Sequence, residues 1–311
     1  MIDKKAKITI FGGTGLLGGA IYRMLKVQGY SNIQTPSRKD GFDLLSKEKV
    51  EDYFRSEKPS ALYMTAGLVG GIKANDTRSA DFLYQNAIMI LNVIEAIKNY
   101  SPTTKILYTG STCIYPKENP QPINESRFMS GYLEETNKGY AVAKGMGIVA
   151  CQLYRKQYGI NAISVMPTNL YGPGDNYDLD NGHFIAAVIR KIFDAKTKNI
   201  IPTFWGTGKP RREALYSEDC ANACIFLMEN YNSPDIVNIG TGFDNSITEY
   251  IEITSRVIGY NGEILWDKSR PDGTFEKRTD ISKLKSIMPD FKPRDFESGL
   301  NEVLRKDFYI S

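Results

Sequence analysis

Near the N-terminus the chain reads Lys7-Ile8-Thr9-Ile10-Phe11-Gly12-Gly13-Thr14-Gly15-Leu16-Leu17-Gly18. The apolar and β-branched run predicts a buried strand, and the residues after the glycines predict a helix with an apolar face. Gly12, Gly15 and Gly18 fit the pattern G-x-x-G-x-x-G, which lets backbone approach a pyrophosphate at the positive end of that helix. We therefore expect a bound dinucleotide, although a glycine-rich turn without a ligand would have the same composition. The residues expected to contact it are Gly12, Thr14, Gly15, Leu16, Leu17 and Gly18.

The end of the second expected strand indicates which dinucleotide is bound. The chain there reads Ile33-Gln34-Thr35-Pro36-Ser37-Arg38-Lys39-Asp40, and no acidic residue closes the strand. An acidic residue would hold the ribose 2′-hydroxyl of NAD, whereas Ser37 and Arg38 offer a donor and a positive charge for the 2′-phosphate of NADP. We expect NADP(H), with contacts from Ser37 and Arg38. The competing interpretation is a solvated basic turn, with Asp40 nearby.

Strand and helix patterns alternate through the first half of the chain. Strands are expected near Ile8 and Ile33 and at Ala61–Met64, Lys105–Gly110 and Ala162–Pro167. Helices are expected from Leu16 and at Lys47–Ser56, Asp81–Asn99 and Gly139–Tyr158. This α/β alternation is typical of a Rossmann-type doubly wound parallel sheet.

The alternation changes after Tyr171, which predicts a second, smaller unit. Helices near Phe184–Ala195 and Ser217–Glu229, and strands near Ile200–Trp205 and Ile236–Ile239, are expected there, the last strand rejoining the main sheet. We assign residues 1–171 plus about 214–242 to the NADP-binding domain. Residues of about 172–213 plus 243–311 form the C-terminal substrate-binding lobe, with small helices and one strand after Thr248.

Composition excludes several classes of protein. The chain has 311 residues, 41% of them hydrophobic, with 39 basic and 36 acidic residues intermixed. No polybasic block indicates nucleic acid or a membrane surface, and no apolar run approaches the ~18 residues of a membrane span. We expect a cytoplasmic protein. With one histidine and four cysteines, none in a C-x-x-C pair, no metal site is expected, and Cys220 and Cys224 are expected in the core.

Tyr140 and Lys144 are the strongest catalytic candidates. Their four-residue spacing places a phenol and an ammonium on one face of the expected helix. A cation beside a tyrosine lowers its pKa toward the working range of a general acid, which carbonyl reduction requires. An exposed helix face is the simpler explanation of the pair alone. Ser111 follows a central strand and adds a hydroxyl where a ligand is expected.

Further motifs carry a resemblance over essentially the whole chain. They are Gly67–Ile72, Gly110–Pro116, Tyr140–Lys144, Met166–Pro173, Asn181-Gly182-His183 and Pro271–Thr274. Through them the chain resembles the extended short-chain dehydrogenase/reductases, and within these the GDP-L-fucose synthase group, the GDP-4-keto-6-deoxymannose 3,5-epimerase/4-reductases.

The resemblance implies two reactions in one pocket on a GDP-linked 4-keto-6-deoxy sugar. In NADPH-dependent reduction at carbon 4, Ser111 polarises the ketone, Tyr140 donates a proton, and Lys144 lowers the tyrosine pKa and holds the nicotinamide ribose. In epimerisation at carbons 3 and 5, Cys113 and His183 serve as base and acid.

The resemblance also implies binding residues and a homodimer. Further cofactor contacts are expected from Tyr140, Lys144, Pro167, Asn169, Leu170 and His183. Contacts to the sugar nucleotide are expected from Asn169, Lys191, Trp205, Arg212 and Asp272. The helices at Asp81–Asn99 and Gly139–Tyr158 are the expected dimer interface.

Some positions depart from the family pattern and leave alternatives open. Thr14 stands where the family commonly has a basic residue, Lys191 where it has Arg, and Ala214 where it has an aromatic side chain. The small Ala214 favours a rival hypothesis: a reductase without epimerase activity, acting on a pre-epimerised GDP-4-keto-6-deoxy-heptose. A more remote alternative is a non-catalytic NADP-binding regulator, a class that typically loses the Tyr-Lys pair.

Overall fold

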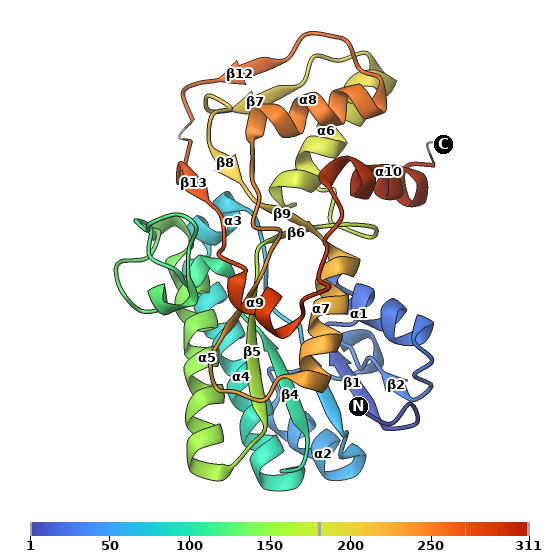
Figure 1. The fold of residues 1–311 in the computed structure, drawn as a ribbon, viewed down its shortest axis with the longest axis vertical. Helices are drawn as coiled ribbons and strands as arrows, with labels where there is room; N and C mark the ends of the chain where they lie inside the picture. The colour runs from blue at the N-terminus through green and yellow to red at the C-terminus, as the bar shows by residue number, and fades with distance from the viewer. Residues whose placement is uncertain (1, 180–181, 271, 310–311) are drawn as a thin grey trace.

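The main layer of the protein is a six-stranded parallel sheet (Figure 1). The computed structural model describes residues 2–179, 182–270 and 272–309. The strand order is β10-β5-β4-β3-β1-β2, and every neighbouring pair is parallel. The strands are β1 (Ile8–Phe11), β2 (Ile33–Gln34), β3 (Ala61–Met64), β4 (Lys105–Thr109), β5 (Ala162–Pro167) and β10 (Val237–Ile239). The predicted doubly wound fold is confirmed, including the return of the last strand to the main sheet.

Helices cover both faces of this sheet because its strands are apolar on both sides. Successive strand residues point to opposite faces, so Ile8 and Tyr63 join one hydrophobic cluster while Leu62 and Met64 join another. On the first face lie α1 (Leu16–Val27) and α7 (Ser217–Asn230), which pack against each other. On the second lie α2 (Lys47–Glu57), α4 (Ser79–Tyr100) and α5 (Lys138–Tyr158).

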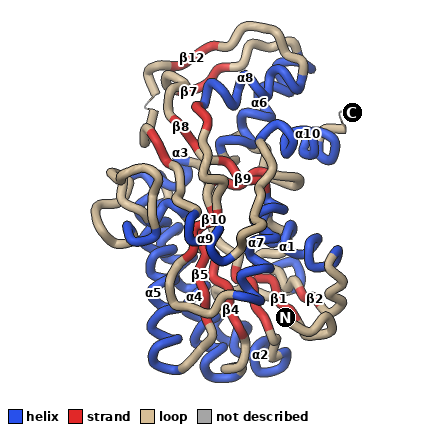
Figure 2. Tube along the Cα trace, in the orientation of Figure 1, coloured by secondary structure: helices blue, strands red, loops and turns tan. Residues whose placement is uncertain are grey.

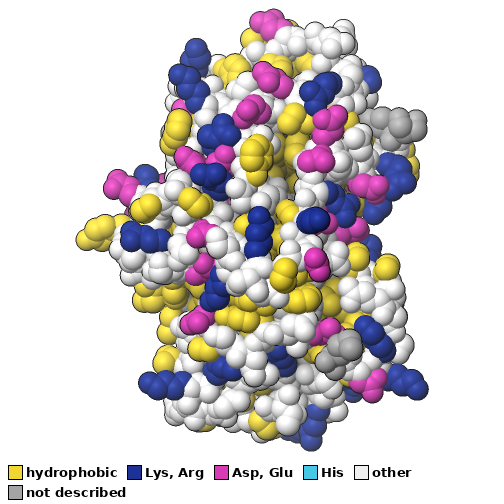
Figure 3. All heavy atoms as spheres, viewed as in Figure 1, with side chains coloured by type: hydrophobic (Ala, Val, Ile, Leu, Met, Phe, Trp, Pro, Cys, Tyr) yellow, Lys and Arg dark blue, Asp and Glu magenta, His cyan; other side chains and the backbone are white. Residues whose placement is uncertain are grey.

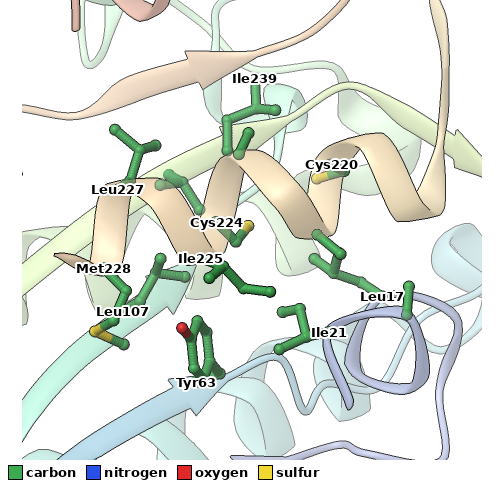
Figure 4. Packing of buried hydrophobic residues seen from close by; sticks show 14 of the residues in the cluster. Leu17, Ile21, Tyr63, Leu107, Cys220, Cys224, Ile225, Leu227, Met228 and Ile239 are labelled. Atoms are coloured by element: carbon green, nitrogen blue, oxygen red, sulfur yellow. The ribbon is translucent and has the colours of Figure 1, made fainter. Parts of the chain in front are cut away.

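The cysteines of α7 belong to the first cluster. Figure 4 shows Cys220 and Cys224 on this helix, close to the strands that carry Tyr63 and Leu107. Both thiols are fully buried. Their predicted place in the core is confirmed.

Smaller sheets and three helices lie beyond the carboxyl ends of the main strands (Figure 2). The smaller strands are β6 (Asn169–Tyr171), β7 (Thr203–Trp205), β8 (Arg211–Arg212), β9 (Ala214–Tyr216), β11 (Asn245–Ser246), β12 (Leu265–Asp267) and β13 (Glu276–Lys277). The helices α6 (Phe184–Lys198), α8 (Ile247–Ile258) and α10 (Phe296–Asp307) contribute to a third hydrophobic cluster. The short helices α3 (Ile72–Thr77) and α9 (Ser282–Ile287) complete the fold.

The expectation of one strand after Thr248 is wrong, because β12 and β13 both form there. Each has only two or three residues and pairs with a strand distant in sequence, β12 with β7 and β13 with β8. Tertiary pairing rather than local propensity defines such short strands. The division of the chain into two domains at about residues 171, 213 and 242 stays a prediction.

One buried carboxylate joins the main sheet to the smaller sheets. Glu213, between β8 and β9, accepts backbone N–H bonds from Thr241 at 2.6 Å and Gly242 at 2.7 Å, just after β10. It also accepts from the backbone N–H of Thr279, after β13, at 2.8 Å and from the Thr279 hydroxyl at 2.7 Å. Burial raises the pKa of Glu213, while these donors act in the opposite direction.

The surface carries mixed charge. On the face drawn in Figure 3, basic and acidic side chains are interspersed. None of the helices in the described part of the chain is both long enough and apolar enough to span a bilayer.

Candidate active site

The glycine loop follows the carboxyl end of β1, at the point where the strand order reverses. The sheet order places β1 between β2 and β3, so the connections from β1 and β3 lead to opposite faces. Gly12 has φ +89°, and a Cβ there would lie 2.7 Å from the Ala66 nitrogen, just after β3. A Cβ on Gly18 would lie 2.1 Å from the Gly12 carbonyl oxygen. The two glycines therefore allow close backbone packing within the loop and against the segment after β3.

The N-terminus of α1 faces this loop. Its N-cap is Gly15, which has no side chain to bind the first helical N–H groups, so the positive end of the helix is left to a ligand. Thr14 and Gly15 are exposed, Leu16 is partly buried, and the Leu17 side chain packs in the first cluster. Leu17 can therefore contact a ligand only through its backbone. This cradle fits a dinucleotide pyrophosphate.

Substitution of Gly15 by Ala is expected to raise the KM for a dinucleotide about tenfold, equivalent to ~1.4 kcal/mol. A Cβ on Gly15 meets only the Gly12 oxygen, at 3.4 Å, and its φ of −84° suits alanine, so the folded chain itself tolerates the methyl group. Steady-state kinetics and thermal unfolding of the variant measure both effects.

Gly18→Ala is the matched control. Its methyl group overlaps backbone, so about 3 kcal/mol of stability should be lost. If Gly15→Ala unfolded as readily as Gly18→Ala, or bound the dinucleotide normally, a ligand-facing role of Gly15 would be excluded.

Ser37 and Arg38, expected near a 2′-phosphate, have carboxylate partners in the structure. The Ser37 hydroxyl donates to Asp40 at 2.6 Å, and Arg38 pairs with Asp43 at 3.3 Å. The Arg38 side chain is 62% exposed, and such surface pairs contribute little free energy. A phosphate dianion competes easily with an exposed carboxylate for these donors. Their role in cofactor binding stays a prediction.

Close packing through glycines holds the N-terminal half of α5 in place. A Cβ on Gly139 would lie 2.2 Å from the Ser79 carbonyl oxygen on α4. A Cβ on Gly147 would lie 2.4 Å from the Tyr108 hydroxyl oxygen on β4. The helix segment between these glycines, which carries Tyr140 and Lys144, is therefore fixed against both α4 and the sheet.

Lys144 is buried beside two tyrosine rings. Its side chain is 4% exposed, and Nζ donates to the Thr109 carbonyl oxygen at 2.9 Å. The ammonium lies 5.3 Å from the centroid of the Tyr108 ring and 5.8 Å from that of Tyr140. Burial lowers the pKa of Lys144 to about 8.

Tyr140 keeps its proton in this environment. Burial raises the pKa of Tyr140, the Cys113 charge raises it further, and a hydrogen bond with Ser111 lowers it. The expectation that Lys144 lowers the pKa of Tyr140 is wrong for the ligand-free protein. Burial has the largest effect on this pKa and raises it, and the Lys144 ammonium donates to Thr109 instead. A protonated phenol at neutral pH is nevertheless the state that a proton donor requires.

Ser111 and Cys113 follow β4 in the 3-10 turn η2 (Thr112–Ile114). The Ser111 hydroxyl accepts the backbone N–H of Cys113 at 3.2 Å, which fixes the start of the turn. The Cys113 thiol is partly exposed, and Nζ of Lys277 on β13 donates to its sulfur at 3.8 Å. The structure thus brings Ser111, Cys113, Tyr140 and Lys144 together. The sequence analysis did not predict Lys277 as a site residue. It lies three positions after the motif Pro271–Thr274, and only the pairing of β13 with β8 brings it to η2.

His183 stands apart from this group. It immediately precedes α6, and its Nδ1 lies 3.7 Å from Oδ1 of Asp175. Among the described residues, no hydrogen bond or ion pair joins His183 to Cys113 or Tyr140. Asn181 and Pro271, which belong to two of the sequence motifs, lie outside the described residues.

Three of the expected cofactor contacts lie at and just after the end of β5. Pro167 ends β5, and the Asn169 amide donates to the Glu213 carbonyl oxygen at 2.9 Å. Leu170 is partly buried against the first hydrophobic cluster. Asn169 is exposed, so its amide oxygen is free to accept from a ligand.

The other expected substrate contacts lie on three different elements: Lys191 on α6, Trp205 at the end of β7 and Asp272 in the loop between β12 and β13. Lys191 donates to the Thr203 carbonyl oxygen at 2.7 Å, and burial lowers the pKa of this lysine. Trp205 is half-exposed. Both carboxylate oxygens of Asp272 bind Thr207, through its N–H at 2.7 Å and its hydroxyl at 2.8 Å. Their roles in substrate binding stay predictions.

Arg211 and Arg212 differ in what they contact. Arg211 donates to the Asp244 carboxylate at 2.8 Å and to Glu249 at 3.4 Å. Arg212 donates only to the neighbouring Arg211 carbonyl oxygen, at 2.8 Å, among the bonds recorded for the described chain. Burial lowers the pKa of Arg212, and the Asp272 charge raises it. Arg212 is therefore the better candidate for an anionic ligand.

Comparison with known proteins places this arrangement in a family. Residues 8–240 match the NAD dependent epimerase/dehydratase family. A GDP-L-fucose synthase from Sinorhizobium fredii is 47% identical over 288 residues, 92% of this chain and 90% of that protein.

Two solved structures are also similar. A GDP-L-fucose synthetase from Naegleria fowleri bound to NADP has a TM-score of 0.91 and 26% identity, covering 99% of this chain and 94% of that one. A GDP-6-OMe-4-keto-L-xylo-heptose reductase from C. jejuni has a TM-score of 0.90 and 29% identity, covering 99% and 98%.

Proposed function

The chain belongs to the NAD dependent epimerase/dehydratase family, and from this membership we propose that it reduces the 4-keto group of a GDP-4-keto-6-deoxy sugar. It is an oxidoreductase that uses NADP(H), and we infer that 3,5-epimerisation precedes reduction in the same site. The observation that carries the proposal is the group of Ser111, Tyr140 and Lys144 at the carboxyl end of β4.

In the reduction, the protein's own residues manage the proton and the developing charge. Bound NADPH supplies a hydride to carbon 4. The protonated Tyr140 donates to the carbonyl oxygen, and the Ser111 hydroxyl, already bonded to that phenol, also contacts the oxygen. Lys144 contributes a fixed positive charge below the pair and, as the resemblance implies, a hydrogen bond to the nicotinamide ribose.

In the epimerisation, Cys113 removes a proton beside the ketone and His183 returns one from the opposite face. The Lys277 ammonium, 3.8 Å from the sulfur, attracts the negative charge that the cysteine needs for this step. The 4-keto group polarised by Ser111 and Tyr140 accepts the charge that develops on the sugar.

The GDP diphosphate requires cationic groups, and Arg212 is the first candidate. Replacing Arg212 with Gln is expected to raise the KM for the GDP-sugar about 10- to 100-fold, because a charge-assisted hydrogen bond contributes about 1.5–3 kcal/mol. The folding stability should change little. Substrate titration and thermal unfolding give the two values.

Arg211→Gln serves as the matched control. It removes the partner of the buried Asp244 carboxylate, so stability should fall by about 2 kcal/mol while the KM of the surviving folded enzyme stays close to wild type. If Arg211→Gln raised the KM for the GDP-sugar more than Arg212→Gln did, the proposed role of Arg212 in binding the diphosphate would be wrong.

The overall proposal is tested by NADPH oxidation with GDP-4-keto-6-deoxymannose in deuterated buffer, followed by mass spectrometry of the product. Turnover with deuterium at carbons 3 and 5 is expected. Turnover without label, or only with a pre-epimerised 4-keto-heptose, would identify a reductase without epimerase activity. No oxidation with any 4-keto sugar nucleotide would favour a non-catalytic regulator.

We also infer a cytoplasmic homodimer that associates through α4 and α5. Tyr84 and Leu91 on α4 and Val142 and Leu153 on α5 are exposed, and their spacings of 7 and 11 residues place each pair on one helix face. Exposed apolar side chains on two packed helices are typical of an interface. Light scattering of the purified protein measures its mass directly.

A further inference from the structure

Asp175 is a buried carboxylate with an unused oxygen. It lies in the loop after β6, and its side chain is 3% exposed. Oδ1 accepts the backbone N–H of Asn176 at 2.7 Å. Oδ2 is buried and has no hydrogen-bond partner in the described part of the chain. Because a buried charge without a donor is costly, a donor from the surroundings is expected to approach it.

His183 presents the complementary group. Its Nδ1 is buried, lacks a hydrogen-bond partner among the described residues, and lies 3.7 Å from Oδ1 of Asp175. The side chain as a whole is 43% exposed, so its accessible surface belongs to atoms other than Nδ1. Oδ1, the oxygen 3.7 Å from Nδ1, accepts one backbone N–H and has lone-pair capacity left, and the unpartnered Oδ2 belongs to the same carboxylate. From 3.7 Å, a movement of either side chain by less than 1 Å would bring Nδ1 to hydrogen-bond distance of this carboxylate.

We propose that Asp175 is a positioning residue that accepts the Nδ1–H of His183 and so makes Nε2 the atom that exchanges a proton with the sugar. This inference rests on the proposed epimerase function. A histidine whose Nδ1–H is held by a carboxylate has a fixed tautomer and ring orientation. In the neutral state Nε2 then carries no proton.

The proton balance of the step follows from this tautomer. The imidazolium gives its Nε2 proton to the sugar carbon, so an N–H bond breaks and a C–H bond forms. The ring that remains is the neutral Nδ1–H tautomer, whose proton stays with Asp175. The carboxylate stabilises the cation before transfer and the correct tautomer after it. Solvent then returns a proton to Nε2.

The single histidine of the chain makes the tautomer directly observable. Protein labelled with 15N-histidine gives one pair of ring nitrogen signals by NMR. In the neutral wild-type ring, we expect a protonated Nδ1 and an unprotonated Nε2. A wild-type ring protonated on Nε2 overturns the proposal without any variant or any enzyme activity.

Asp175→Asn tests the consequence for the reaction. The amide can donate to Nδ1, so the ring should shift toward the Nε2–H tautomer. Deuterium incorporation into the 4-keto sugar should then fall about 10²- to 10³-fold, within the range for a general acid or base. NADPH oxidation with a pre-epimerised 4-keto sugar should stay within about twofold of wild type. Unchanged incorporation or an unchanged tautomer contradicts the proposal.

Asp307→Asn is the matched control, because Asp307 anchors the same loop without facing the imidazole. It accepts from the Gly174 N–H at 2.8 Å and the Tyr177 hydroxyl at 2.6 Å. If Asp175 only fastened the loop, both variants would lower incorporation equally and neither would change the tautomer. If wild-type protein incorporated no deuterium at all, the epimerase function would fail, while the NMR result would still decide how Asp175 acts on His183.

Discussion

Replacing Tyr140 with Phe is expected to lower kcat for 4-keto reduction by about 10³-fold, within the 10²–10⁴ range of a lost general acid. The phenol is the group that holds its proton at neutral pH, because burial raises its pKa. Without it, the Ser111 hydroxyl is the donor that the proposed mechanism leaves at the oxygen formed at carbon 4. Single-turnover oxidation of NADPH measures the loss, and fluorescence titration with NADPH should show a far smaller change in Kd than in kcat.

Tyr108→Phe is the control for this substitution. Tyr108 is a second buried tyrosine beside the same ammonium, with its ring centroid 5.3 Å from Lys144 Nζ, and burial raises the pKa of this tyrosine too. Its hydroxyl points at Gly147 in the core rather than at Ser111. The control should therefore retain nearly full turnover. Robust reduction by Tyr140→Phe, or an equal loss of kcat in the two variants, would show that Tyr140 is not the proton donor.

Lys144→Met is expected to abolish reduction while making the ligand-free protein more stable, by about 2 kcal/mol near pH 7. Burial lowers the pKa of Lys144 from 10.5 to about 8, and each pKa unit corresponds to ~1.36 kcal/mol, so keeping the charge costs about 3 kcal/mol. Loss of the hydrogen bond to Thr109 destabilises the variant by about 1 kcal/mol, so the net gain in unfolding free energy is about 2 kcal/mol. Denaturant unfolding measures the difference between the two proteins.

The sign of the pH dependence is a second test of the same substitution. Above pH 8 the folded wild type sheds the Lys144 proton while the unfolded chain keeps it to about pH 10.5. The unfolded state then binds more protons, so wild-type stability rises with pH relative to the variant. The difference in unfolding free energy between Lys144→Met and wild type should therefore shrink between pH 8 and 10. A variant less stable than wild type at pH 7 would show that desolvation does not dominate at this site.

Lys105→Met is the matched control for the Lys144→Met variant. Lys105 begins β4 at the end of the strand opposite the active site, and burial lowers its pKa too. Its Nζ also donates to a backbone carbonyl, that of Tyr231, at 2.6 Å. This variant should change stability less than Lys144→Met, because Lys105 is only partly buried, and its turnover should match wild type.

Local sequence was sufficient for the elements that depend on local patterns. The strand and glycine loop at Ile8–Gly18 follow from apolar periodicity and glycine spacing, and Tyr140 and Lys144 share a helix because four residues make one turn. The parallel, doubly wound character of the sheet follows from the alternation of strands and helices.

What the sequence did not reveal depends on contacts between distant segments. Lys277 reaches Cys113 across 164 positions, and two-residue strands such as β13 have no local pattern of their own. Asp175 lies in a loop rich in Asn and Asp, where nothing in the sequence marks it as buried. The direction of the Tyr140 pKa was missed because desolvation is a property of the packed site rather than of the Tyr-Lys spacing.

The buried carboxylate of Glu213 affects how the smaller sheets can move relative to the main sheet. The chain passes between the main sheet and the smaller sheets beside this residue, and donors after β10 and after β13 hold both crossings to one buried side chain. We expect a hinge motion of the smaller sheets to pivot close to this point, because these bonds hold both segments to the same side chain. In such a motion Arg212 and Asn169, which adjoin Glu213, would keep their spacing to the main sheet, whereas the distant β7–β12 pair would move furthest. The diphosphate contact proposed for Arg212 would then stay nearly stationary while the smaller sheets opened for substrate exchange.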